Sequence, residues 1–350
     1  MKKILYIASA LAFIACGSGK NALKKEEATI DQAAKYAATI TAKDLGAHLF
    51  VYASDEFEGR NTGEPGQKKA VAYLKNFYVN EGIESPIGGD DYFQEVPAEW
   101  LNKNLRGGGL KDSENVLAFI KGTEKPDEIV VISAHLDHEG IKDGEIYNGA
   151  DDDGSGTVAI LEIAQAFQAA AKNGKGPKRS VLFLHVTGEE KGLLGSKYYT
   201  ENPIFPLANT VTDLNIDMVG RIDDSHKADP NYVYLIGADK LSQELHELSE
   251  AINKKYTNIN LDYKYNDEND PNKFYYRSDH YNFAKHNIPI IFYFNGTHAD
   301  YHKPTDTPDK INYELLENRA RLVFHTAWEV ANRESRIFAD KLNPEKEETK

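Results

Sequence analysis

Short apolar runs and amphipathic stretches alternate along this chain. Nearly continuous apolar runs predict buried strands at residues 115–120, 129–133, 180–187, 212–218, 232–236 and 289–294. Apolar residues spaced three or four apart predict helices at residues 40–53, 65–82, 155–171, 191–201, 241–256 and 312–332. Because strands and helices alternate throughout, we expect a three-layer α/β/α sandwich around a central sheet that is mixed but mostly parallel.

A single folded domain is the simplest organisation for these elements. The chain has 350 residues, and neither a repeat nor a low-complexity linker interrupts residues 43–333. That length is ample for a buried core. We therefore expect one domain at residues 41–335, preceded by a polar tether at 17–40 and followed by a charged tail at 336–350.

The N-terminus has the pattern of a targeting segment. Two lysines precede an apolar run, Ile4 to Ala15, that is too short to span a bilayer comfortably. Cys16 follows, so residues 1–16 resemble a bacterial lipoprotein signal; an ordinary secretory signal is the alternative. We expect export to the periplasm or cell surface, with a lipid anchor on Cys16 as the only membrane contact. Because this is the only cysteine, no thiol remains for disulfide or catalytic chemistry.

The net charge of the chain limits the classes of partner that it can bind. Hydrophobic residues make up 41% and charged residues 27% of the sequence, with a formal net charge of −14. These proportions are ordinary for a globular protein. Since nucleic-acid binding needs a basic face, nucleic acid is excluded as a partner.

Acidic and imidazole side chains gather where the predicted strands end. Because the carboxyl ends of parallel strands share one edge of an open α/β sheet, where ligands bind, these groups are expected to converge. In chain order they are His135 with Asp137, the aspartates at 151–153, Glu189 with Glu190, Asp217, and a segment from His298 to Asp306 that includes Tyr301 and His302.

Such a cluster of acidic and imidazole side chains at one edge of the sheet favours bound cations. Carboxylates crowded in a cleft repel one another, and burial penalises their charged forms. Imidazole and carboxylate together suit zinc and similar first-row ions. Two imidazoles and three carboxylates exceed the needs of one tetrahedral zinc with an open position, but they fit two ions that share one carboxylate.

Two pairs of side chains that are close in the sequence can each supply two different roles in the site. Adjacent side chains in an extended chain point in opposite directions. One of Glu189 and Glu190 can therefore bind metal while the other faces the substrate as a general base. Asp137, two residues after His135, can lie behind the imidazole and fix its orientation.

Six segments in this order resemble the co-catalytic di-zinc exopeptidases. They are SAHLDH, NGADDDGSG, TGEEKGLLGS, NIDMVG, RSDHYNF and DYHKPTDTPDKI. That family includes the bacterial leucyl aminopeptidases, with glutamate carboxypeptidase, transferrin receptor and glutaminyl cyclase as more distant relatives. The resemblance covers roughly residues 41–332 and implies two zinc ions, with cobalt or manganese as alternatives.

The resemblance implies a ligand set. His135 and Asp217 would hold one zinc, Glu190 and His302 the other, and Asp152 would bridge them. It also implies a cis peptide bond directly after that bridging aspartate.

The resemblance further implies roles for four other side chains. Glu189 would be the general base, Asp137 would orient a ligand histidine, and Tyr301 would stabilise the oxyanion. Asp306 would support the loop of the last ligand histidine. Independently of the resemblance, we expect His280 either to lie behind the ligands or to cap the following helix.

The remaining histidines and aspartates have simpler interpretations. His185 lies within an apolar strand and is expected in the core, while His138 and His298 match no ligand position and are expected on the rim. Asp151 and Asp153 are expected to serve the loop or cap the helix rather than bind metal.

The expected function is that of an aminopeptidase acting on peptide substrates. Carboxypeptidase or dipeptidase action stays open. One alternative is a glutaminyl-peptide cyclotransferase, which generally works with a single zinc; another is a non-catalytic, receptor-like binding protein.

Overall fold

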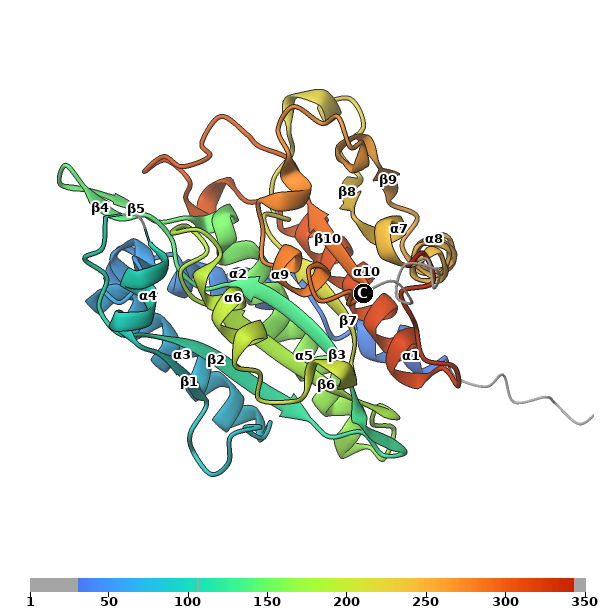
Figure 1. Cartoon of the computed structure of the whole chain (residues 1–350). Coiled ribbons are helices and arrows are strands. Elements are labelled where there is room, and N and C mark those ends of the chain that lie inside the picture. Colours follow the sequence, from blue (N-terminus) through green and yellow to red (C-terminus); the bar gives the residue numbers. More distant parts are fainter. Residues whose placement is uncertain (1–30, 106, 343–350) are drawn as a thin grey trace, which may run out of the picture. The chain divides into compact units, whose positions relative to one another are not determined.

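A mixed eight-stranded sheet forms the centre of the fold, in the order β1-β2-β6-β3-β7-β10-β8-β9 (Figure 1). The structure is a computed structural model that describes residues 31–105 and 107–342. The strands are β1 Phe93–Val96, β2 Ser113–Ile120, β3 Lys125–His135, β6 Arg179–Val186, β7 Thr210–Ile216, β8 Tyr232–Ile236, β9 Asn260–Asp262 and β10 Ile290–Phe294, with a separate hairpin of β4 Gly140–Lys142 and β5 Glu145–Tyr147.

Four neighbouring strands in the middle of the sheet run parallel. β3 pairs in parallel with β6 on one side and with β7 on the other, and β7 pairs in parallel with β10. Outside these four strands, β2 pairs antiparallel with β6, β1 antiparallel with β2, β8 antiparallel with β10, and β9 in parallel with β8. The carboxyl ends of the four central strands therefore meet at one edge, as the sequence predicts.

Helices cover both faces of the sheet. The helices in the described part are α1 Gln32–Ala37, α2 Ala42–Tyr52, α3 Pro65–Glu81, α4 Ala98–Asn104, α5 Gly156–Lys172, α6 Leu194–Glu201, α7 Ala238–Leu241, α8 Gln243–Tyr256, α9 His280–Ala284 and α10 Tyr313–Asn332. Helices α3, α5 and α10 pack on one face, whereas α6 and α9 pack on the other. The predicted three-layer α/β/α fold is confirmed. None of these helices is long and apolar enough to cross a membrane.

Alternate residues of each central strand belong to two different cores. Val130 and Ile132 pack with α5 and α10, whereas Val131, on the opposite face, packs with α6 and α9. Val181 and Leu182 of β6 divide in the same way. Two buried faces explain why these strands are continuous apolar runs rather than alternating ones.

The ends of the domain differ from the sequence prediction. Within the expected tether, Gln32–Ala37 forms α1, whose Tyr36 is buried in the core together with Ile40. At the other end, Ile337 is buried and the Asp340 carboxylate accepts hydrogen bonds from the first amides of α8. The folded domain thus begins at about residue 32 and continues at least to 342. The expected signal segment, most of the tether and the last residues of the charged tail lie outside the described residues.

Candidate metal centre

The predicted site residues come from the carboxyl ends of the four parallel strands. His135 is the last residue of β3, and Asp217 directly follows β7. Glu189 and Glu190 lie in the loop after β6, and His302 lies in the loop after β10. Asp152 comes from the turn between residues 150 and 155 that leads into α5. Parallel pairing therefore gathers residues that are far apart in the sequence.

The turn that carries Asp152 is held by backbone contacts. The peptide bond between Asp152 and Asp153 is cis, which confirms the expectation from the resemblance. Asp306 Oδ2 accepts hydrogen bonds from the amides of Asp151 at 3.0 Å and Asp152 at 3.2 Å. We expected Asp306 to support the loop of His302; these bonds join that loop, on which Asp306 lies, to the turn of Asp152.

Asp153 joins three segments beneath the site. Its carboxylate accepts hydrogen bonds from the amides of Gly156 at 2.9 Å, Met218 at 3.1 Å and His135 at 3.3 Å. The carboxylate is thus committed to backbone amides, at the start of α5 and at two strand ends. This agrees with the expected capping role.

Asp152 lies between two imidazoles. His135 Nε2 is 3.1 Å from its Oδ1, and His302 Nε2 is 3.0 Å from its Oδ2. Asp217 Oδ1 lies 3.7 Å from His135 Nε2, and Glu190 Oε2 lies 3.3 Å from His302 Nε2. The five predicted ligands therefore form two groups of donor atoms that share Asp152.

The donor atoms fit a metal better than they fit one another. His135 Nε2 is buried yet makes no hydrogen bond, and the same is true of Glu190 Oε1. Buried polar atoms without partners are costly, so such atoms signal a missing ligand. A tetrahedral zinc with bonds of 2.0–2.1 Å keeps its donors about 3.3 Å apart, close to the spacings seen here. Nitrogen and carboxylate oxygen donors at this spacing suit zinc.

The charges of these side chains shift one another's pKa values. Burial works to raise the pKa of Asp152, but the imidazoles of His135, His138 and His302 outweigh it and hold the pKa well below its usual value. Burial works to lower the pKa of His302, but the carboxylates of Asp152 and Glu190 raise it to about 10. The site is therefore built to hold positive charge.

Glu189 and Asp137 are linked. Burial raises the pKa of Glu189 well above its usual value, and its backbone amide donates to Asp137 Oδ1 at 3.1 Å. The other carboxylate oxygen of Asp137 accepts from Thr62 Oγ1 at 2.7 Å. His135 Nδ1 lies 3.0 Å from the backbone oxygen of Asp137 but 3.9 Å from its carboxylate. The expected hold on the imidazole thus comes mainly from the main chain.

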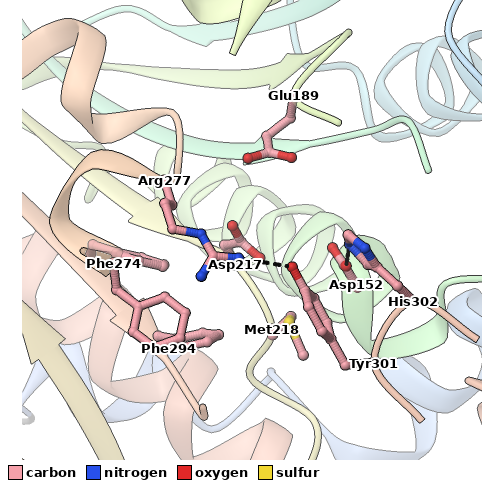
Figure 2. A pocket seen from close by; sticks show the side chains of 10 residues that line it. Asp152, Glu189, Asp217, Met218, Phe274, Arg277, Phe294, Tyr301 and His302 are labelled. Carbon is pink, nitrogen blue, oxygen red and sulfur yellow. Dashed lines mark hydrogen bonds and ion pairs between the residues drawn. The ribbon is translucent and has the colours of Figure 1, made fainter. Parts of the chain in front are cut away.

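An aromatic pocket opens beside the donor atoms. Figure 2 shows Glu189 pointing into it from one side and Tyr301 from the other. The Tyr301 ring stacks on His302 with centroids 3.9 Å apart, and its hydroxyl accepts a hydrogen bond from Arg277 Nη2 at 3.4 Å. The remaining wall is mostly apolar and consists of Met218, Phe274, Phe292 and Phe294.

Two histidines that we expected on the rim are more buried than predicted, and His280 lies behind the pocket wall. His138, expected on the rim, is fully buried, and its Nδ1 is 2.8 Å from Glu190 Oε1. His298 is also nearly buried and lies 3.1 Å from Asp151 Oδ2. His280, which we expected behind the ligands or at the helix cap, contacts the Tyr275 backbone oxygen through Nε2, and its ring stacks on Phe292 of the pocket wall. His138 directly follows Asp137 at the end of a predicted strand, and this position could have identified it as a residue of the site.

Sequence reasoning also missed the partner of Asp217. Ser278 Oγ donates a hydrogen bond to Asp217 Oδ2 at 2.7 Å. Ser278 is fully buried and lies two residues before the start of α9. In the RSDH segment we considered only His280 as a candidate site residue, but Ser278 is the residue that contacts Asp217.

Comparison with known proteins agrees with this geometry. Residues 115–327 match the sequence model of Peptidase family M28. The chain belongs to that family. This M28 chain is 30% identical over 245 residues to a probable leucine aminopeptidase of Trichophyton verrucosum, covering 67% of this chain and 60% of that one. It is 37% identical over 111 residues to the aminopeptidase NAALADL1 of Rattus norvegicus, covering 31% of this chain and 14% of that one. The matches thus span less than two thirds of these relatives.

Solved structures share the fold of this M28 chain. An aminopeptidase from Aneurinibacillus sp. strain AM-1 superposes with a TM-score of 0.63 at 17% identity, covering 89% of this chain and 98% of that one. LapB from Legionella pneumophila superposes with a TM-score of 0.67 at 20% identity, covering 87% of this chain and 76% of that one. At these identities the likeness concerns the fold.

Proposed function

We propose that this chain is a zinc-dependent aminopeptidase that removes single residues from the N-terminus of peptides. The observation that carries the proposal is the position of Asp152, whose two oxygens face the imidazoles of two separate donor groups. Membership of the M28 peptidases and the names of the relatives, which include aminopeptidases from a fungus and a rat, support the same function.

The donor groups suit two ions rather than one. His135 and Asp217 would hold the first ion, Glu190 and His302 the second, and Asp152 would bridge them. Two divalent ions, three carboxylates and one hydroxide sum to zero charge. When bound, such ions polarise a scissile carbonyl and lower the pKa of the attacking water. Cobalt or manganese could occupy the same donors.

Glu189 would move the proton. Its buried carboxyl has a raised pKa, which suits a group that takes a proton from the attacking water and then gives it to the leaving amine. Tyr301, across the pocket, would donate its hydroxyl proton in a hydrogen bond to the oxygen that becomes negative during attack. Burial raises the pKa of Tyr301 far above its usual value, so the hydroxyl stays a donor.

The aromatic wall would hold the side chain of the first substrate residue. Phe274, Phe292 and Phe294 offer apolar surface with no polar side-chain atom, so a large apolar residue would bury the most area there. We therefore propose a preference for N-terminal residues such as leucine or phenylalanine.

Metal content and hydrolysis measured on one preparation test this function. Aminoacyl-anilides, with the amine free or blocked, would be assayed with and without a chelator. Two ions per chain and chelator-sensitive cleavage of free-amine substrates alone are expected. One ion with cyclisation of N-terminal glutamine would identify a cyclotransferase instead. Bound metal with neither activity would indicate another exopeptidase mode or a receptor-like role.

We also propose export and anchoring through a lipid on Cys16. The two N-terminal lysines, the short apolar run and the single cysteine support this. Replacing Cys16 with Ser would release the protein from the membrane fraction if the anchor exists. An unchanged distribution of the variant would contradict it.

A further inference from the structure

His138 is the one histidine that touches the metal carboxylates, within the described residues, without having been assigned as a ligand. Its Nδ1 lies 2.8 Å from Glu190 Oε1 and 3.8 Å from Asp152 Oδ2. Both carboxylates also face His302. His138 therefore belongs to the same donor group as Glu190 and His302.

The polar atoms of His138 are unsatisfied in the same way as those of a predicted ligand. The side chain is fully buried, and neither ring nitrogen makes a hydrogen bond. The distance to Glu190 Oε1 is short enough for a hydrogen bond, yet that oxygen also lacks one. His135 Nε2 shows the same combination of burial, short carboxylate distance and absent hydrogen bond. Atoms that approach without aligning are typical of donors turned toward a common ion.

The spacing of the four donors around this position fits a single ion. His138 is 2.8 Å from Glu190 and 3.8 Å from Asp152, while His302 is 3.3 Å and 3.0 Å from the same two residues. These values surround the spacing of about 3.3 Å expected for a tetrahedral zinc. Two imidazoles and two carboxylates would thus enclose one ion.

The His138 ring packs closely against the backbone of Gly149. The glycine has a φ of 53°, and a Cβ added there would lie 2.4 Å from Cγ and 2.5 Å from Cδ2 of the ring. The ring therefore lies directly against a position that only glycine fits. Its plane makes an angle of 71° with that of His302, with centroids 5.7 Å apart.

We propose that His138 Nδ1 is a fourth protein ligand of the ion held by Glu190, Asp152 and His302. This rests on the two-ion site of the proposed function. One ion would then have four protein ligands, as structural zinc sites do, and the other would have three, His135, Asp152 and Asp217, as catalytic zinc sites do. The four-ligand site binds first and more tightly, and the three-ligand site keeps an open position for substrate.

X-ray absorption of the purified full chain loaded with zinc counts imidazoles directly. Three histidines shared by two ions give an average of about 1.5 imidazoles per zinc, against about 1 if only His135 and His302 bind. A value near 1 overturns the proposal. Because this measurement needs no variant, it stays decisive even if a substitution disturbs folding.

Metal titration of variants tests the same point by affinity. His138→Gln keeps a donor that can reach Glu190 but removes the imidazole, and His138→Ala removes both. His298→Gln is the matched control, because His298 is a nearly buried histidine that contacts Asp151 instead of the metal carboxylates. We expect both substitutions at 138 to weaken the tight step by at least about 100-fold, beyond what supporting residues usually contribute, while the control titrates like the wild type.

Two results would overturn the assignment. If His138→Gln bound zinc with wild-type affinity and only His138→Ala bound it more weakly, His138 would be a hydrogen-bonding support for Glu190 and not a ligand. If both variants bound zinc with wild-type affinity, His138 would have no role in metal binding. If the wild type bound no zinc, the proposed function itself would fail, which neither of these results would cause.

Discussion

The carboxylate of Asp137 accepts a hydrogen bond from the backbone amide of Glu189 at 3.1 Å. This bond joins the end of β3 to the loop after β6, so the proposed base is positioned by the strand that carries His135. Asp137→Ala should release the loop and reduce kcat by about 100-fold, since small displacements of reacting groups are costly. Zinc content should stay unchanged, because the main chain of residue 137 still contacts the imidazole.

Asp137→Asn provides the matched control for this prediction. The amide oxygen can still accept from Glu189, and the Thr62 hydroxyl can turn to accept from the new amide group. We expect kcat to stay within about tenfold of the wild type. If zinc were lost from Asp137→Ala together with activity, the carboxylate would be orienting His135 after all.

Glu189→Gln should separate proton transfer from metal binding. The glutamine keeps the shape of the side chain but cannot take a proton, and a positioned general base contributes about 10² to 10⁴ in rate. We expect kcat to fall by that factor while zinc per chain stays at the wild-type value. Stopped assays with a leucyl-anilide and elemental analysis of the same sample measure both. Near-normal turnover would remove Glu189 from the proton-transfer role.

Residues at strand ends could be predicted because their positions depend on local pattern alone. The apolar run before His135 and the one before Glu189 mark buried strands, and parallel strands in an α/β sheet bring such ends together. His185 was likewise expected in the core, and the structure confirms that it is fully buried. The family motifs then added the cis bond after Asp152.

The contacts that were missed depend on side-chain direction, which the pattern does not contain. Whether His138 faces solvent or Glu190 depends on how the chain turns after β3, where the ring comes to lie directly against Gly149. Similarly, Asp306 reaches the turn of Asp152 from more than 150 positions away in the chain. The helix at Gln32–Ala37 was missed because its six residues are too short to show a helical period.

The aromatic wall predicts a selectivity change that differs from a general loss of activity. Phe294→Ala should lower kcat/KM for leucyl and phenylalanyl substrates by about 10- to 100-fold, because a buried aromatic side chain contributes a few kcal/mol of contact. Alanyl substrates should lose much less, since they do not reach the wall. Phe50→Ala, at a side chain that is 55% exposed, is the control. Equal losses on all substrates would exclude a binding role for this wall.

Removing zinc should destabilise the fold as well as stop catalysis. An ion that binds only the folded chain stabilises it by about 4 kcal/mol when its free concentration is 1,000 times its Kd. We expect urea unfolding in excess chelator to have a lower midpoint than in zinc buffer, with the slope unchanged. Glu190→Gln, which lacks one ligand charge, should show a smaller difference between the two buffers. Equal midpoints in the wild type would mean that the donors hold no ion under these conditions.

His185 should make stability depend on pH in a predictable direction. Its Nε2 lies 2.6 Å from the Tyr78 hydroxyl, and burial lowers its pKa to about 3, against 6.5 in an unfolded chain. Below pH 6.5 the unfolded chain therefore gains a proton that the folded chain does not bind. Stability is fully present above pH 6.5 and falls by about 1.4 kcal/mol per pH unit toward pH 3.

His185→Gln isolates this contribution, because glutamine stays neutral and its amide oxygen can accept from Tyr78. Urea unfolding of the wild type and the variant, both in chelator, should be compared at pH 6, 5 and 4, so that metal release does not contribute. Burial also lowers the pKa of His280 to about 3, so the variant should keep part of the dependence. The slope of its unfolding free energy should be shallower by about 1.4 kcal/mol per pH unit. Identical slopes would show that His185 already carries a proton in the folded chain.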